Sequence, residues 1–284
     1  MAKIAVKPKA RLLAKGNGWA VSDVVCTAGP QDRPFEECHS GASIAVVVAG
    51  TFQYRSTTGC ELMTPGSLLL GNAAQSFTCG HEHGTGDRCV SFSYSPEFFE
   101  RLASDAGAAR MSFKALRIPP VRELSPLVAQ TAAVLAGVNR LTCEELSTML
   151  AAQTVQLERG VAPRRTGWEP SSLARVTRVV RMIESDPESF HNLASLARQA
   201  GLSSYHFLRT FQALTGTTPH QYLLRLRLRR AAIRLRTEAA KILDVALDCG
   251  FRDLSNFNHA FRLEFGASPR AYRQTLTSRI SPAA

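Results

Sequence analysis

Apolar residues in the first 115 positions occur in short runs that glycine, proline and polar residues interrupt. Residues 44–49 form a continuous apolar run, and residues 51–55 alternate between apolar and polar after a break at Gly50. A turn at Pro65 and Gly66 then precedes another apolar run. Short strands at this spacing are typical of a small β-barrel or sandwich rather than of alternating strands and helices. A barrel of this size can hold one small ligand.

The pattern changes to a helical period after Ser95. This serine and the proline that follows it begin a short predicted helix, because serine caps helices well and proline suits the first helical position. Residues 124–137 and 141–157 predict two further helices, and the capping-box residues Thr142 and Glu145 begin the second of them. The apolar stripe of that helix can pack on its own barrel or form a dimer seam, and the sequence favours neither.

A linker is predicted over residues 161–170, which contain two prolines and a glycine without an apolar period. We therefore expect an N-terminal domain over residues 1–160 and a second domain over residues 171–284. A helix capped by Ser171 or Ser172 should open the second domain. Its apolar face consists of Leu173, Val176, Val180 and Ile183.

The second domain contains a duplicated pattern. Residues 193–216 and residues 242–266 repeat the same order of residue types at an offset of 49 to 50 positions. Each copy reads as a helix, a glycine turn and a second helix, which is the pattern of a DNA-reading helix-turn-helix. The paired positions include Ala197 and Ala246, Gly201 and Gly250, Phe207 and Phe257, Phe211 and Phe261, and Gly216 and Gly266.

The second helix of each copy divides into an inward and an outward face. Phe207 and Phe211 should face the core, as should their counterparts Phe257 and Phe261, because residues four apart share one face of a helix. In a helix-turn-helix the outward face of this helix enters the major groove. The candidate DNA-binding residues are Ser204, Tyr205, His206, Leu208, Arg209, Thr210, Leu254, Ser255, Asn256, Asn258, His259 and Arg262.

Individual side chains on these faces suit different contacts. Arg209 is the strongest candidate for base reading, because arginine commonly binds the O6 and N7 atoms of guanine. Asn256 or Asn258 can pair with adenine, whereas Ser255 and Arg262 are better suited to phosphate.

Residues 218–236, between the two copies, predict one helix that begins at Thr218. A rise of about 1.5 Å per residue gives this helix roughly 27 Å, close to the ~34 Å between successive major-groove faces. We expect it to space the two units along DNA. Its arginines are expected to lie mostly on a solvated face with a few ion pairs. They are Arg225, Arg227, Arg229, Arg230, Arg234 and Arg236.

Positive charge concentrates in the second domain. The chain has a formal net charge of +11, and residues 166–284 hold 17 of its 34 Lys and Arg but 9 of its 23 Asp and Glu. That region therefore has a net charge of +8, against +3 for residues 1–165. Such an excess favours a polyanionic partner such as double-stranded DNA.

The duplicated stretch also carries a specific set of residues: Leu196-Ala197, Gly201-Leu-Ser203, Arg209-Thr-Phe211, Gly216, Arg227-Leu228, Ala231, Gly250-Phe251, Ser255-Asn-Phe257, Phe261 and Gly266-Ala-Ser-Pro269. This set resembles the DNA-binding domain of the AraC/XylS family of transcriptional regulators, and the resemblance extends over about a third of the chain. The family usually has arginine or lysine at the position of His259, so the second unit is expected to read bases less directly.

The resemblance implies an α+β protein, with a cupin-like β-barrel and two helices in front of an all-α domain of two helix-turn-helix units joined by a linker helix. It implies an effector-responsive transcription regulator, in our interpretation an activator, which works as a homodimer. Double-stranded DNA, RNA polymerase and an unknown small-molecule effector are the expected partners. We expect no enzyme activity and no cofactor.

One cluster in the barrel region leaves an alternative function open. Cys79, His81, His83 and Cys89 include the metal-ligand pattern His-x-His, and alternation along a strand would put the first three on one side. The cluster can form a polar loop with incidental histidines, a metal or thiol sensor, or contacts to an organic ligand. The alternative function is therefore a cupin-type metal-binding enzyme, or a metal or thiol sensor, fused to the same DNA-binding domain.

The cysteine content and the hydropathy indicate the compartment. The seven cysteines are an odd number without a framework spacing, which favours a reducing compartment. The chain has no run of 18 apolar residues, and its basic start lacks the apolar core of a secretory signal. A cytoplasmic protein without a membrane partner is expected.

Overall fold

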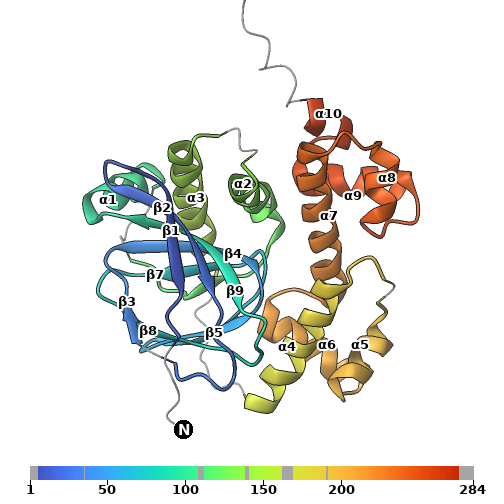
Figure 1. Cartoon of the computed structure of the whole chain (residues 1–284), viewed down its shortest axis with the longest axis horizontal. Helices are drawn as coiled ribbons and strands as arrows, with labels where there is room; N and C mark the ends of the chain where they lie inside the picture. Colours follow the sequence, from blue (N-terminus) through green and yellow to red (C-terminus); the bar gives the residue numbers. More distant parts are fainter. Residues whose placement is uncertain are drawn as a thin grey trace, which may run out of the picture.

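The computed structural model describes residues 6–34, 36–107, 112–137, 141–161, 169–189 and 191–274. Within these residues, a β-rich N-terminal domain lies beside an all-helical C-terminal domain (Figure 1). The predicted α+β fold class is therefore confirmed. Most of the predicted linker, residues 162–168, lies outside the described residues.

The strands of the N-terminal domain are β1 (Lys9–Gly16), β2 (Trp19–Cys26), β3 (Glu36–Cys38), β4 (Ala42–Ala49), β5 (Phe52–Ser56), β6 (Gly59–Met63), β7 (Leu68–Gly71), β8 (Ser76–Gly80), β9 (Asp87–Tyr94) and β10 (Arg117–Ile118). They form two antiparallel sheets. The larger sheet has the strand order β1-β2-β9-β4-β7-β10, and the smaller has the order β3-β8-β5-β6. The sheets pack face to face, so their inner surfaces enclose the interior of the barrel.

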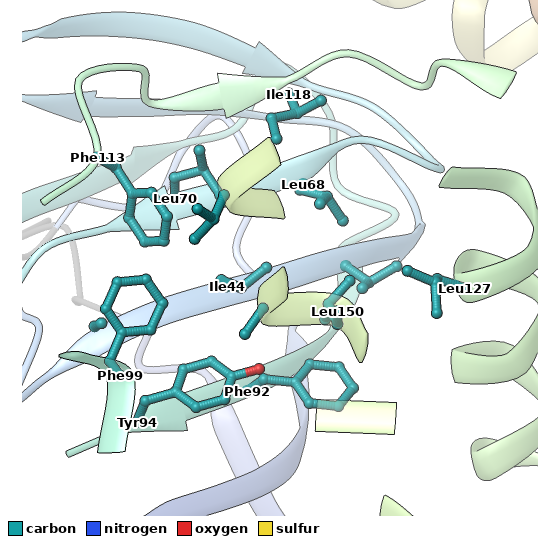
Figure 2. Packing of buried hydrophobic residues seen from close by; sticks show 14 of the residues in the cluster. Ile44, Leu68, Leu70, Phe92, Tyr94, Phe99, Phe113, Ile118, Leu127 and Leu150 are labelled. Atoms are coloured by element: carbon teal, nitrogen blue, oxygen red, sulfur yellow. The ribbon is translucent and has the colours of Figure 1, made fainter. Parts of the chain in front are cut away.

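Strand β4 is apolar along most of its length because both faces of the larger sheet are covered. Ile44 and Val46 belong to the cluster under the helices, whereas Ala45 and Val47 pack with residues of the smaller sheet. Figure 2 shows the helix-side cluster, in which Leu150 lies over the sheet beside residues such as Ile44. The continuous apolar run in the sequence thus marks a strand buried on two sides.

The helices of this domain are α1 (Pro96–Asp105), α2 (Ser125–Leu135) and α3 (Cys143–Glu158), with a 3-10 turn, η1 (Arg122–Leu124), before α2. Helix α3 begins with the predicted capping box of Thr142 and Glu145. Leu146 and Leu150 of α3 are fully buried against the larger sheet, while Met149 is 49% exposed. The apolar stripe of α3 therefore packs on its own barrel.

The C-terminal helices are α4 (Pro170–Ser185), α5 (Leu193–Ala200), α6 (Ser204–Thr215), α7 (Pro219–Thr237), α8 (Ile242–Asp248), α9 (Leu254–Phe265) and α10 (Pro269–Gln274). The predicted order of helices is confirmed. The predicted cap of the first one is wrong, because Glu169 occupies the cap position and Pro170 begins α4 without a side-chain cap hydrogen bond. Proline fixes the helical φ angle at this position and needs no capping acceptor.

Each helix-turn-helix unit has its own core, built around a pair of phenylalanines. Phe207 and Phe211 are fully buried against α4 and the start of α7, and Phe257 and Phe261 are fully buried against the end of α7. Helix α7 contributes residues to both cores, and Figure 1 shows it running from one unit to the other. Its 19 residues correspond to a length of about 28 Å.

A short segment of the N-terminal domain, residues 117–125, contacts the C-terminal domain at several points. Arg117 is 4% exposed, and its guanidinium donates hydrogen bonds to the carbonyl oxygens of Leu62 in β6, at 2.9 Å, and Leu214 in α6, at 2.8 Å. Its Nε lies 3.1 Å from a carboxylate oxygen of Glu61. The segment therefore links β6 to the end of α6.

The same segment reaches α7 and the second unit. The carbonyl oxygen of Pro120 accepts a hydrogen bond from Arg225 of α7 at 3.0 Å. Ser125 donates a hydrogen bond to Glu264 near the end of α9, and Glu264 also lies 3.5 Å from Arg225. Both second helices are thus held near their C-terminal ends by one segment of the N-terminal domain.

The arginines of α7 are not mainly a solvated face, so that prediction is wrong. Arg229 is 6% exposed and donates to the carbonyl oxygen of Pro65 in the N-terminal domain at 3.2 Å. Arg236 donates to Gln130 of α2 at 2.6 Å. The other four arginines are Arg225, Arg227, Arg230 and Arg234. They donate to the backbone carbonyls of Pro120, Pro187, Ser189 and Glu184. They also pair with the carboxylates of Glu188, Glu238, Asp248 and Glu264.

A carboxyl group near Arg229 should make the stability of the protein depend on pH. Burial raises the pKa of Glu184 to about 7, and this effect outweighs the opposing influence of the Tyr222 hydroxyl, which donates to it at 2.8 Å, and of nearby arginines. A carboxyl with a higher pKa in the folded state binds its proton more tightly there. The free energy of unfolding should therefore fall as the pH rises from about 4.5 to about 7.

We predict that Glu184→Gln raises the melting temperature relative to the parent at pH 8 and has little effect at pH 5. Glutamine can still accept the hydrogen bond from Tyr222 but carries no charge that burial penalises. Thermal melts across this pH range would measure the difference. Glu188→Gln, which alters an ion pair of two partly exposed side chains, is the control and should show no such trend. Parallel pH profiles for the Glu184→Gln variant and the parent would contradict the prediction.

The Arg117 contact should be costly to break. Arg117→Met should reduce the free energy of unfolding by about 3–5 kcal/mol, because it leaves the Glu61 carboxylate without its cationic partner in a site that is largely buried. Chemical denaturation would measure the loss. Adding Glu61→Gln to Arg117→Met should recover part of it, and equal stabilities for the single and double variants would show that the buried pair is not the cause.

Candidate nucleic-acid interface and barrel cavity

The first unit presents the outer face of α6. Ser203 caps this helix by accepting a hydrogen bond from the backbone nitrogen of His206 at 3.3 Å, and Phe207 and Phe211 fix the opposite face in the core. Of the predicted contact residues, Ser204, Tyr205, His206 and Arg209 are exposed, while Leu208 and Thr210 are half-buried. The predicted outward face is thus formed mainly by the first turn and a half of the helix.

Two of these side chains form a pair. Tyr205 is 63% exposed, and the Arg209 guanidinium lies 5.7 Å from the centre of its ring. Arg209 also donates a hydrogen bond to the Tyr205 hydroxyl at 3.2 Å. A cation held on a ring in this way keeps few rotamers, so the guanidinium is presented outward in a restricted orientation.

The second unit presents the outer face of α9. Asp253 caps the helix by accepting a hydrogen bond from the backbone nitrogen of Asn256 at 2.6 Å. Leu254, which was predicted to face outward, packs partly against the core of this unit. The exposed residues among the predicted contacts are Ser255, Asn256, Asn258, His259 and Arg262.

The predicted glycine turns are confirmed. Gly201 and Gly250 have φ angles of +63° and +86°, in the left-handed region that glycine tolerates. At Gly250 a Cβ atom would also lie 2.9 Å from the Arg227 guanidinium and from the Cα atom of Glu188. This turn therefore holds α8 and α9 against the loop before α5.

A cavity of about 640 Å³ lies between the two sheets of the N-terminal domain. Its lining is partly apolar, as at Phe52 and Leu69, and partly polar, as at Arg55, Ser91 and Ser93. A cavity of this size and mixed character is typical of a small-molecule site.

A histidine outside the predicted cluster, His39, lies in the wall of this cavity. His39 stacks on Phe77, with ring centres 4.3 Å apart, and its Nε2 lies 2.8 Å from the Tyr54 hydroxyl. Burial lowers the pKa of His39 to about 4, so its imidazole is neutral at pH 7. Phe77 of β8 and Tyr54 of β5 lie on neighbouring strands of the smaller sheet, and His39 directly follows the adjacent β3. The pairing joins strands that are distant in the sequence, so no local sequence pattern could have revealed it.

The predicted cysteine and histidine cluster is only partly assembled. Cys79, His81 and Cys89 line the cavity. His83 does not join them: it is 4% exposed, and its two ring nitrogens lie 2.7 Å from the Thr51 hydroxyl and 2.8 Å from the Thr85 hydroxyl. The predicted alternation of side chains along a strand does not include the histidines, because β8 ends at Gly80 and both histidines follow it.

His81 instead lies with Asp87, which follows it in the same stretch, and with Cys26 of β2. Its Nε2 lies 2.6 Å from a carboxylate oxygen of Asp87, and Cys26 lies beside it. Burial acts to lower the pKa of His81, but the hydrogen bonds with Asp87 and Cys26 outweigh burial and raise it to about 9. Asp87 was visible in the sequence near His81, whereas Cys26 is distant along the chain.

Comparison with known proteins supports the assignment of the C-terminal domain. Residues 196–275 match the family model described as a helix-turn-helix domain. Over 104 residues the chain is 38% identical to the HTH-type transcriptional activator RhaS of Escherichia coli O139:H28 (strain E24377A / ETEC). These matches support the similarity of the C-terminal domain to the DNA-binding domain of the AraC/XylS family. The match covers 37% of this chain and 37% of the length of RhaS, so the chain matches little more than a third of that relative.

Solved structures of AraC-type domains are similar to the same region. The DNA-binding domain of AdpA, determined in complex with a target DNA, is 32% identical, with 37% of this chain and 96% of that chain covered and a TM-score of 0.36. An AraC-type regulator from Chromobacterium violaceum is 29% identical, with 39% and 99% covered and a TM-score of 0.35. The matched family points to a DNA-binding regulator rather than to an enzyme. None of the described helices is long and apolar enough to cross a bilayer.

The exposed Tyr205–Arg209 pair leads to a prediction about the two AraC-type units. Arg209→Ala should weaken binding to the preferred DNA site by about 1–3 kcal/mol and relax sequence preference, whereas His259→Ala should cost less. Titrations with the preferred and single-base-variant duplexes would measure both effects. Arg101→Ala is a matched control, because Arg101 is also an exposed arginine near an aromatic ring, on the N-terminal domain. Equal losses for Arg209→Ala and His259→Ala would mean that the two units read DNA alike.

Proposed function

We propose that the protein is an effector-responsive transcription regulator that binds two adjacent major-groove segments of double-stranded DNA, and that it acts as an activator. The observation that carries this proposal is the pair of helix-turn-helix units with exposed outer faces, the first of which presents Arg209 on Tyr205. The similarity of this domain to the activator RhaS supports activation. RNA polymerase is the corresponding partner.

The spacing of the units supports the reading of neighbouring groove segments. Helix α7 is about 28 Å long, somewhat shorter than the ~34 Å of one turn of DNA. DNA that bends toward the protein can make up such a difference at a cost of a few kcal/mol.

The barrel cavity is the proposed effector site, and a chain of contacts joins it to the first unit. His39 in the cavity wall is hydrogen-bonded to Tyr54 of β5, and Tyr54 pairs with Glu61 across the β5–β6 ladder. Glu61 binds Arg117, which in turn binds the Leu214 carbonyl at the end of α6. A molecule that favours one arrangement of this chain would shift the placement of the first unit.

A homodimer is the proposed assembly. The face of α3 that points away from the barrel carries Met149, which is 49% exposed. Met149 would then contribute a flexible apolar side chain to the contact with a second copy.

Selection of bound duplexes from a random pool, followed by footprinting with the full-length protein, would test the proposed function. We expect two protected segments about one helical turn, or roughly 10 base pairs, apart. Binding should weaken steeply with salt, because arginine contacts to phosphate release counterions. Absence of any sequence-dependent, salt-sensitive binding would reject the proposal. A promoter reporter carrying the selected site would test activation, and a fall in expression would reject that part alone.

A further inference from the structure

Three metal-ligand side chains meet in the wall of the barrel cavity. Cys26, His81 and Asp87 each offer one donor atom, and these atoms all lie within 4.8 Å of one another. The Nε2 atom of His81 lies 2.6 Å from a carboxylate oxygen of Asp87. The side chains of these two residues are 4% and 8% exposed. Cys26 is likewise buried, with 8% of its surface exposed.

The sheet architecture fixes this meeting point. Cys26 is the last residue of β2 and Asp87 is the first residue of β9, and the two stand opposite each other in the β2–β9 ladder. His81 directly follows β8 of the other sheet. The three donors therefore join the two sheets at one edge of the barrel.

Close backbone packing fixes the chain next to Cys26 and Asp87. Gly86 has a φ angle of +72°, and a Cβ atom there would lie 2.3 Å from the carbonyl oxygen of Cys26. A Cβ atom on Gly50 would similarly lie 2.3 Å from the carbonyl oxygen of Gly86. Glycine at these two positions lets the chain turn tightly into Asp87, so the donors are held on rigid elements rather than on a free loop.

The donor set has a defined chemical preference. A thiolate, an imidazole and a carboxylate together suit Zn²⁺ and similar transition metals, whereas Mg²⁺ and Ca²⁺ prefer oxygen ligands alone. Ligand atoms of a tetrahedral zinc site lie about 3.3–3.8 Å apart, as follows from bond lengths of about 2.0–2.3 Å. The short contact between His81 and Asp87 would therefore open by roughly 1 Å as an ion replaces the shared proton.

We propose that Cys26, His81 and Asp87 bind one divalent transition-metal ion of the zinc type. All three residues line the cavity, so the fourth coordination position is open to water or to a small molecule there. This site is independent of the DNA-binding surface. Of the sequence-based cluster it keeps His81 alone, and it adds Cys26 and Asp87.

Titration of the full-length, chelator-treated and reduced protein with CoCl₂ would test the site. We expect one Co²⁺ per chain, with the charge-transfer absorption of a cobalt–thiolate bond, and competition by ZnCl₂ but not by MgCl₂. Cys26→Ser should abolish the charge-transfer band, and His81→Gln and Asp87→Asn should each weaken binding at least about tenfold. Failure of the parent protein to bind Co²⁺ would reject the proposal.

Cysteine controls locate the binding. Cys38→Ser removes an exposed thiol that also lines the cavity, and Cys143→Ser removes a half-buried thiol on α3, outside the cavity lining. Both variants should keep the stoichiometry and spectrum of the parent. A Cys26→Ser protein with an unchanged cobalt spectrum, or loss of the spectrum in Cys38→Ser, would overturn the assignment.

Two further measurements distinguish a defect in metal binding from a defect in folding or in DNA binding. Zn²⁺ should raise the melting temperature of the parent protein more than that of Asp87→Asn. Because both proteins must be folded to show a melting transition, a smaller shift in the variant reports weaker metal binding rather than misfolding. Arg209→Ala should bind Co²⁺ like the parent. A parent protein that binds Co²⁺ but no DNA would count against the proposed regulator alone, and a parent protein that binds DNA but no Co²⁺ would count against the metal site alone.

Discussion

The arrangement of the two domains depends on one buried charge. Arg117 is almost completely removed from water, and a guanidinium in such a place is stable only when its donors are matched by acceptors. The acceptors come from two domains: Glu61 and the Leu62 carbonyl belong to β6, and the Leu214 carbonyl belongs to α6. Moving the first helix-turn-helix unit away from the barrel would therefore leave a buried cation short of a partner. This requirement fixes the relative placement of the two domains in addition to holding them together.

The rest of the interface follows from the same short segment. Pro119 packs against Gly216, where a Cβ atom would lie 2.4 Å from the proline ring, and Ser125 reaches Glu264 at the end of α9. The N-terminal domain thus touches the C-terminal ends of both second helices and leaves the early turns of α6 and α9, which carry the outward residues, exposed. Helix α7 takes part through Arg225 and Arg229, so the helix that spaces the two units also docks them on the barrel. A change in the barrel can therefore act on α7 as well as on the ends of α6 and α9.

The sequence predicted what depends on local periodicity, and it failed where distant segments meet. Alternation and turns predicted the β-rich domain, and the duplicated phenylalanines and glycines predicted both helix-turn-helix units. The arginines of α7 were misjudged because a solvated helix face and a polar interdomain face have the same composition and period. Cys26 and Asp87 could not be paired from the sequence, since their proximity follows from the register of two strands 61 positions apart in the chain. His83 was misplaced because a strand was assumed to continue past Gly80.

The loop between β8 and β9 shows how the cavity and the DNA-binding domain can influence each other. It begins with His81 at the cavity wall, and it holds His83 between Thr51 and Thr85. Burial lowers the pKa of His83, and the positive charge of Arg181 on α4 adds to this effect. An ion bound by Cys26, His81 and Asp87 would act on the loop that contains His81 and His83. The metal site and the Arg117 contact would then reach the first unit by separate routes, through α4 and through the end of α6, whereas the second unit is held through Ser125 and Glu264. The two units therefore differ in how the barrel can control them as well as in the side chains that they present to DNA.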